Sequence, residues 1–132
     1  MPWRAHYAVM ATIVQPINGH KIIIARPEEA VLELVEAKGL LAQIEIASAS
    51  LNDYRIAIDT LGVESSMTVY DYWHLAVELN HYRHVFFEKT AIVCPPEHLE
   101  LAEFFAHAAH FHGVPCRAFA DLQDAMDWLI EP

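Results

Sequence analysis

The residues best suited to chemistry lie in one short segment, which reads IDTLGVESSMT between residues 58 and 68. An apolar run ends at Asp59, and Thr60, Ser65, Ser66 and Thr68 follow before a helical pattern begins. In domains of alternating strands and helices, ligands and partners dock outside the carboxyl ends of the strands, next to helix N-termini. We therefore take these five residues as candidates for binding a ligand or partner, and the two serines as candidate phosphorylation sites.

Two interpretations of this loop stand side by side. In the first, Asp59 orients the loop amides or accepts a hydrogen bond from Thr60 or Ser66, and the free N–H groups near Thr68 hold an anion or a phosphoryl group. In the second, Thr68 only caps the helix and the serines are ordinary loop residues, because every domain of this class needs such a loop.

Histidine is the next candidate for chemistry, with nine in the chain. His107 and His110 are three residues apart on a predicted helix, as are His81 and His84, so each pair shares a helix face. A metal site needs a third ligand and supporting hydrogen bonds, and no pattern such as H-E-x-x-H is present. His107 and His110 are weak metal candidates, and we predict no metal site and no cofactor.

A cysteine nucleophile is a further possibility. Cys94 ends an apolar run and His98 follows four residues later, as a nucleophile and its base could. Pro95 and Pro96 lack the backbone N–H groups that an oxyanion hole would need there. The chain has no G-x-S-x-G motif, and its glycines form neither a Walker loop nor G-x-G-x-x-G. We therefore predict that the protein is not an enzyme.

The charge and cysteine content of the chain indicate which classes of partner it can bind and where it is located. The net charge is -10, from 18 acidic against 8 basic residues, and the basic residues are scattered singly. A nucleic-acid binder needs clustered Lys and Arg, so nucleic acid is disfavoured, as is an anionic membrane surface. No apolar run is long enough to span a membrane. The two cysteines, Cys94 and Cys116, lie in apolar runs typical of buried thiols in a cytosolic protein, so we predict a cytoplasmic location.

The element pattern alternates between strands and helices. Apolar runs predict strands over 7–14, 21–25, 55–59, 90–94 and 114–119, with Asn18-Gly19 turning the first hairpin. Helices are expected from Pro27 onward, over 68–83, over 97–112 and after Asp121. Gly39 ends or interrupts the first helix, because residues 40–49 are again apolar and compatible with a helix, and 39–52 is not assigned to one element. Because parallel strands need helical crossovers, we predict one α/β domain over 1–132 with a mixed, mostly parallel five-stranded sheet and about four helices.

Two helix details are predicted more closely. Thr68 with Asp71 three residues on resembles a capping box. The apolar spacing of the same helix predicts a core face, and that of the next helix predicts another. The first face comprises Val69, Tyr72, Trp73, Ala76 and Val77, and the second Leu101, Phe104, Phe105 and Ala108.

The order of segments resembles a known family. RIAID, the LGV loop, TAIVCPPE, AEFFAHAAHFHG, CRAF and the ending DLQDAMDWL are similar to the STAS-like, SpoIIAA-like group over residues 54–130. The resemblance implies a non-catalytic domain related to anti-sigma factor antagonists. In those proteins the loop carries an Asp-Ser pair whose serine is phosphorylated, whereas this chain has Glu64 in place of the Asp, followed by Ser65 and Ser66. The fold group also resembles CRAL-TRIO lipid-binding domains.

Three functions follow as hypotheses. The first is a regulatory or protein-interaction module that docks through the loop and helix after the Arg55–Asp59 strand. The second is a domain that binds an anion or a lipid at strand ends formed by Asp59, Cys94 and Phe119. The third is a histidine-rich metal-binding protein. A homodimer is also plausible, because the N-terminal hairpin leaves an edge strand open to pairing.

Overall fold

A computed structural model of the protein describes residues 10–17, 19–28 and 31–132, and a five-stranded sheet forms its centre. The strands are β1 (Met10–Ile17), β2 (His20–Pro27), β4 (Arg55–Asp59), β6 (Thr90–Val93) and β7 (Cys116–Phe119), in the spatial order β1-β2-β4-β6-β7. β1 runs antiparallel to β2, and the remaining neighbouring pairs, β2–β4, β4–β6 and β6–β7, are all parallel. The predicted mixed, mostly parallel sheet is confirmed.

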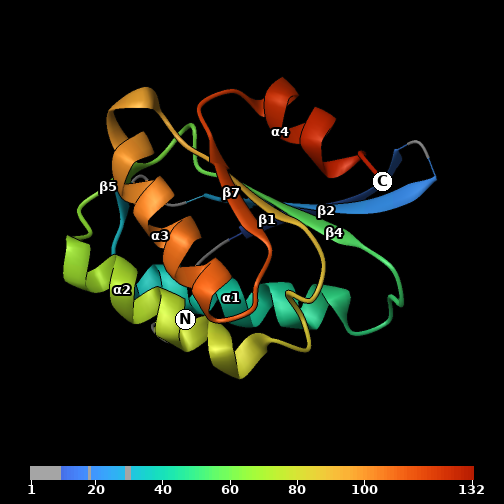
Figure 1. Ribbon diagram of the computed structural model, residues 1–132, viewed down its shortest axis with the longest axis horizontal. Coiled ribbons are helices and arrows are strands. Elements are labelled where there is room, and N and C mark those ends of the chain that lie inside the picture. The colour runs from blue at the N-terminus through green and yellow to red at the C-terminus, as the bar shows by residue number, and fades with distance from the viewer. Residues whose placement is uncertain (1–9, 18, 29–30) are drawn as a thin grey trace, which may run out of the picture.

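Four α-helices cover the two faces of this sheet unequally (Figure 1). They are α1 (Leu34–Ser48), α2 (Val69–Glu78), α3 (Leu99–Phe111) and α4 (Leu122–Leu129), with short 3₁₀ turns at Leu79–Tyr82 and Pro96–His98. Side chains of α1, α2 and α3 share one apolar core with the sheet, and in the part of the chain that the structure describes α4 packs on the other face. Within the described residues, no helix is long and apolar enough to cross a membrane.

The two cores follow from the alternation of side chains along each strand. In β2, Ile23 and Ala25 face the three-helix side, and Ile22 and Ile24 face α4. Because both faces are covered, the central strands are apolar at nearly every position, as expected for parallel strands. This double burial explains why their sequences gave such clear strand predictions.

The prediction for the first helix is wrong. Pro27 is the last residue of β2, and residues 31–32 form a short strand, β3 (Val31–Leu32), that pairs in parallel with β5 (Glu64–Ser65). α1 begins only at Leu34 and continues through Gly39 to Ser48, which settles the unassigned region. The partner that fixes β3 lies more than thirty residues away, so local sequence could not reveal it.

The predicted N-terminal hairpin is present, and two glycines adopt the backbone conformation that turns require. β1 continues through Pro16, which is opposite Lys21 in the register, to Ile17, beyond the predicted strand end at residue 14. Residues 7–9 of the predicted first strand, and Asn18 of the predicted turn, lie outside the described residues. Gly19 and Gly113 have φ values of 81° and 89°, the left-handed region that glycine favours.

The buried face of α2 differs from the predicted one. Val69, Trp73 and Val77 are exposed, and Leu75 is buried in addition to the predicted Ala76. Tyr72 is half-buried against the core, as predicted. α2 packs against α1 and α3 rather than lying flat on the sheet, so its buried side is narrower than an apolar pattern suggests. Likewise Phe104 of α3 is exposed, while Phe105 and Ala108 are buried as predicted.

Candidate functional site

The loop after β4 is anchored by Asp59. Asp59 is only 9% exposed, and its Oδ2 accepts a hydrogen bond from Arg26 Nε at 2.8 Å. Its Oδ1 accepts from the Leu61 amide at 3.1 Å, so the carboxylate does orient a loop amide. Thr60 does not bond to it: the Thr60 hydroxyl donates to the Val93 carbonyl at 2.7 Å. Both oxygens of Asp59 are therefore engaged within the fold.

The second half of the loop is fixed by the small β3–β5 sheet and by the start of α2. The Ser66 amide donates to the Leu32 carbonyl at 3.2 Å. Thr68 and Asp71 form the predicted capping box, with the Thr68 amide on Asp71 Oδ2 at 2.9 Å and the Asp71 amide on Thr68 Oγ1 at 3.2 Å. The first turn of α2 is thus partly satisfied by its own side chains, which leaves less of it for an external anion.

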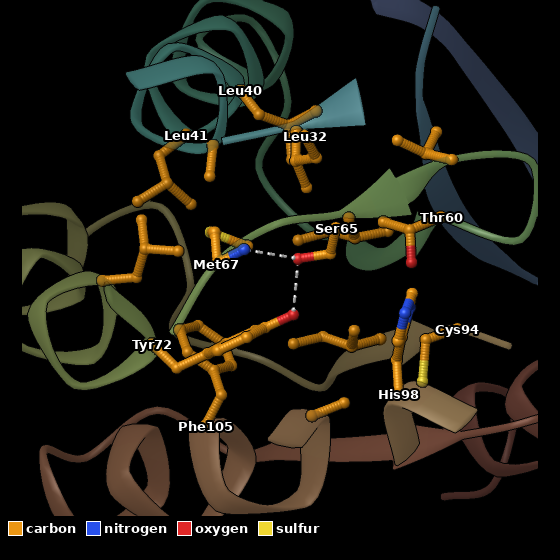
Figure 2. A pocket seen from close by; sticks show the side chains of 16 residues that line it. Leu32, Leu40, Leu41, Thr60, Ser65, Met67, Tyr72, Cys94, His98 and Phe105 are labelled. Carbon is orange, nitrogen blue, oxygen red and sulfur yellow. Dashed lines mark hydrogen bonds between the residues drawn. The ribbon is translucent and has the colours of Figure 1, made fainter. Parts of the chain in front are cut away.

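A pocket lies beneath this loop, between α1, α2, α3 and the ends of β4 and β6. Figure 2 shows its lining: apolar side chains of α1, α2, α3 and the β3–β5 segment surround a few polar groups. Its volume is about 70 Å³. Eleven of the sixteen lining residues are apolar: Leu32, Ala37, Leu40, Leu41, Ile58, Val63, Met67, Leu75, Ile92, Ala102 and Phe105.

The polar part of the lining centres on a pair of hydroxyl groups. Ser65 Oγ and Tyr72 Oη lie 3.2 Å apart, and Ser65 Oγ also accepts from the Met67 amide at 3.3 Å. Figure 2 shows both oxygens directed into the pocket. Burial raises the pKa of Tyr72, and this outweighs the opposing effect of the Ser65 hydrogen bond. The phenol therefore stays protonated at neutral pH.

Cys94 and His98 line the same pocket from the β6 side. Desolvation, with smaller contributions from Glu103 and Glu97, raises the pKa of the Cys94 thiol to about 11. The thiol is therefore protonated at neutral pH, unlike the thiolate that a cysteine nucleophile requires. The Cys94 amide is occupied by the Phe119 carbonyl at 3.0 Å.

The structure separates the residues that the sequence grouped as one site. Thr60 and Ser65 line the pocket, whereas the Ser66 and Thr68 side chains are exposed on the outer surface. The suggested trio of Asp59, Cys94 and Phe119 does not form one site. Cys94 lines the pocket and Asp59 pairs with Arg26. Phe119 packs against Trp128 on the α4 side, with ring centroids 5.6 Å apart.

Sequence reasoning missed the apolar half of the pocket, and it missed Tyr72. Of the lining residues from α1, Leu40 and Leu41 lay in the unassigned region and Ala37 just before it. Tyr72 was interpreted as part of a core face. The available signal was the phenol itself, because a buried tyrosine hydroxyl needs a hydrogen-bond partner.

The histidine candidates lie on the surface. His107 and His110 are exposed on α3. His84 pairs with Glu45 at 2.8 Å, and His112 bonds to Asn80 at 3.0 Å. In the described part of the chain, no three His, Cys, Asp or Glu residues are grouped closely enough to hold a metal ion.

The outer side of α2 carries several exposed apolar side chains. Tyr70 is 84% exposed, and the exposed side chains of Val69, Trp73 and Val77 lie along the same helix. We call these four residues the α2 outer face. Leu61 of the preceding loop is also exposed. The face is thus available to a partner, next to the loop that the sequence singled out.

Comparison with known proteins supports the fold. No protein-family model matches the chain, and no curated protein matches it. Among solved structures, it is similar to an uncharacterised protein of the DUF3478 family with a SpoIIAA-like fold, from Shewanella loihica PV-4. The two share 19% sequence identity with a TM-score of 0.62, over 92% of this chain and 94% of that one. The match confirms the SpoIIAA-like fold that the sequence resemblance implied.

Proposed function

We propose that this domain is a non-enzymatic binding module that takes a small, largely apolar molecule in the pocket beneath the β4–α2 loop. The observation that supports this most strongly is the lining, in which apolar side chains of three helices and three strands surround an interior space at the carboxyl ends of β4 and β6. Ligand sites in open α/β sheets occur at that edge, and small-molecule sites are mostly apolar with a few polar groups.

The size of the pocket sets the size of its ligand. At about 70 Å³, it is roughly half as large as the ~150 Å³ apolar cavity that takes benzene. A short chain therefore enters with modest adjustment, whereas a six-membered ring requires the pocket to widen. A larger ligand requires lining residues to change rotamer, and Met67 is the most adaptable of them because its side chain is unbranched.

Charge favours the apolar ligand over the anion that the sequence also allowed. None of the lining residues is Lys or Arg, and Glu97 and Glu103 act electrostatically on Cys94 at the rim. The net charge of the chain is -10. A carboxylate or phosphate in the pocket would thus be desolvated without a permanent positive partner, which is costly.

A pair of matched variants tests the proposal. Ala37 lines the pocket and is 4% exposed, whereas Ala47 lies on the same helix outside the lining. Ala37→Leu fills the pocket, and Ala47→Leu adds the same atoms elsewhere. In a thermal-shift screen of small ketones, esters, alkanes and aromatics, ligands should raise the melting temperature of the wild type and of Ala47→Leu. The same ligands should leave Ala37→Leu unshifted. No stabilising compound for the wild type, or equal shifts in both variants, would contradict the proposal.

A second candidate function is docking of a regulatory protein, and the α2 outer face favours it. Exposed aromatic and β-branched side chains next to the loop would supply the apolar centre of an interface. Ser66 is exposed beside this face, whereas the Ser65 hydroxyl faces the pocket. Of the two candidate phosphorylation sites, Ser66 is therefore the one that a kinase would reach. Phosphate there would add charge and acceptors near a helix N-terminus.

Site-specific crosslinking tests the docking function. A photo-crosslinking amino acid is placed at Trp73, on the α2 outer face, and separately at Gln123, exposed on α4. In the native cells, we expect a discrete crosslinked protein from position 73 and none from position 123. Equal yields at both positions would rule out docking through α2. Mass spectrometry of the same material would show whether Ser66 carries phosphate.

A further inference from the structure

We infer that the pocket selects ligands with a neutral hydrogen-bond acceptor, such as the carbonyl oxygen of a small ketone or ester, and that the Ser65–Tyr72 pair supplies the donor. This inference rests on the proposed ligand-binding function and names the chemical class of its ligand.

The Ser65–Tyr72 pair carries one more hydroxyl hydrogen than its shared hydrogen bond uses. Ser65 Oγ and Tyr72 Oη share one hydrogen bond at 3.2 Å, in which either atom can be the donor. The Met67 amide fills a further acceptor position on Ser65 Oγ. The two hydroxyls carry two hydrogens, and only one can lie between the two oxygens. Whichever direction that bond takes, one O–H at the wall of the pocket has no acceptor among the residues that the structure describes.

A hydroxyl group that donates no hydrogen bond is unfavourable in apolar surroundings, because its desolvation without an acceptor costs free energy. Apolar residues make up most of the lining around it. The other hydroxyl of the lining, that of Thr60, is already committed to the Val93 carbonyl at 2.7 Å. An occupant with an acceptor oxygen would satisfy the spare O–H, whereas a pure hydrocarbon would leave it unpaired.

The acceptor should be neutral. Burial raises the pKa of Tyr72, so the pair stays fully protonated and can donate at neutral pH. His98 is the single lining residue able to carry a positive charge. The negative charges of Glu103 and Glu97 help to raise the pKa of Cys94, which lines the same pocket. A carbonyl oxygen takes the spare hydrogen bond without bringing a charge that the lining cannot neutralise.

Two probes of nearly equal shape separate the acceptor from the apolar body. Cyclohexanone and methylenecyclohexane differ by an oxygen in place of a CH₂ group. Titration followed by amide NMR shifts should give dissociation constants for both in the wild type. One additional hydrogen bond corresponds to roughly 2- to 10-fold tighter binding of the ketone. Equal binding of the two probes would overturn the inference alone, whereas binding of neither would overturn the proposed function as well.

Variants of the pair identify the donor. Ser65→Ala and Tyr72→Phe each leave one hydroxyl, so each single variant should keep a preference for the ketone. The double variant has no hydroxyl in the pair and should lose the preference for the ketone, because the carbonyl would be desolvated without a hydrogen-bond partner. Tyr70→Phe removes a phenol from the exposed side of the same helix, and it should behave as the wild type. A double variant that retains the full preference would place the donor elsewhere and contradict the inference.

A second measurement needs no variant. The carbonyl ¹³C resonance of labelled cyclohexanone moves downfield when its oxygen accepts a hydrogen bond and upfield in an apolar solvent. Relative to the ketone in hexane, we expect a downfield shift on binding to the wild-type protein. A bound resonance at the hexane position would overturn the inference even if the double variant failed to fold.

Discussion

At the scale of single residues, the loop after β4 divides into residues that hold the fold and residues that line the pocket. Asp59 belongs to the first kind, because both of its carboxylate oxygens bond within the protein. Ser65 belongs to the second, because its hydroxyl lines the pocket beside Tyr72. The sequence placed both in one candidate site, since their types alone do not show which groups the fold has already used.

Substitution of Asp59 should therefore cost stability. Asp59→Asn keeps an acceptor for the Leu61 amide and weakens only the bond with Arg26. Because Arg26 is 43% exposed, solvent screening keeps that cost near 1 kcal/mol. Asp59→Ala removes both bonds and should cost about 2–3 kcal/mol. Urea denaturation measures the free energy of unfolding of both variants, with Asp53→Ala at an exposed position as the control. Equal stability of Asp59→Ala and the wild type would contradict this role of the carboxylate.

The two thiols should react slowly in the folded protein. Burial raises the pKa of Cys94 to about 11 and that of Cys116 to about 12, from an ordinary value of 9.0. Since the thiolate is the reactive form, alkylation of Cys94 by iodoacetamide at pH 8 should be about a hundredfold slower than in urea. Mass spectrometry of the alkylated peptides measures the rates. Comparable rates in the folded and unfolded protein would show that Cys94 is not desolvated.

The same pKa shifts predict how stability depends on alkaline pH. Each folded-state pKa is raised above the unfolded value, so the unfolded chain loses its thiol protons first as pH rises. The stabilisation is fully present below pH 9 and is lost as pH rises toward 11 and 12. The urea midpoint should fall across that range. A Cys94→Ala/Cys116→Ala variant should show a shallower fall, and an identical slope would contradict the prediction.

At the scale of elements, α2 performs two tasks with its two sides. Its inner side contributes Tyr72 and Leu75 to the pocket, and its outer face carries exposed apolar residues. Hydrophobic periodicity could not separate the two, because apolar residues occur on both sides of the helix. The pattern did locate the helix and its capping box, which depend on local chemistry alone.

The elements that sequence reasoning placed correctly are those fixed by local signals. The central strands are recognisable from their continuous apolar runs, and Gly113 marks the end of α3. The start of the first helix was wrong because β3 exists through its pairing with β5. Pro27 fits either a helix start or a strand end, and only the tertiary partner decides between them.

The capping box offers a test at this scale. Thr68→Ala removes the oxygen that accepts from the Asp71 amide and should destabilise the protein by about 1 kcal/mol. Thr68→Ser keeps the hydroxyl and should stay close to the wild type. Urea denaturation compares the two variants, and equal stability of Thr68→Ala and Thr68→Ser would contradict a stabilising cap. Because the cap orders the segment next to Met67, Thr68→Ala should also weaken ligand binding.

At the scale of the whole molecule, the unequal covering of the sheet explains the position of the pocket. Three helices share one face with the sheet, and in the described part of the chain α4 packs on the other. The pocket opens among the three helices at the carboxyl edge, where the general rule for α/β sheets places ligands. The same rule led from the sequence to the loop that borders this pocket. The walls supplied by α1 and α2 depended on packing that no local pattern records.

Self-association also belongs to this scale. In the described sheet β1 is an edge strand. An open edge strand in the hairpin was the reason for predicting a homodimer from the sequence. Pro16 lies within β1 and offers no N–H to a neighbouring strand, as in edges that are protected from pairing. A dimer through this edge remains a prediction, and the exposed α2 outer face is the alternative surface for it.

The most direct test of the central claim is an NMR titration of the wild type and of Ala37→Leu with cyclohexanone. In the wild type, we predict saturable shifts concentrated at the pocket, including the Met67 methyl group and the amides of Ser65 and Ile92. The same additions should leave the spectrum of the filled variant unchanged. Shifts of equal size in both proteins, or none in either, would contradict a ligand site beneath the β4–α2 loop.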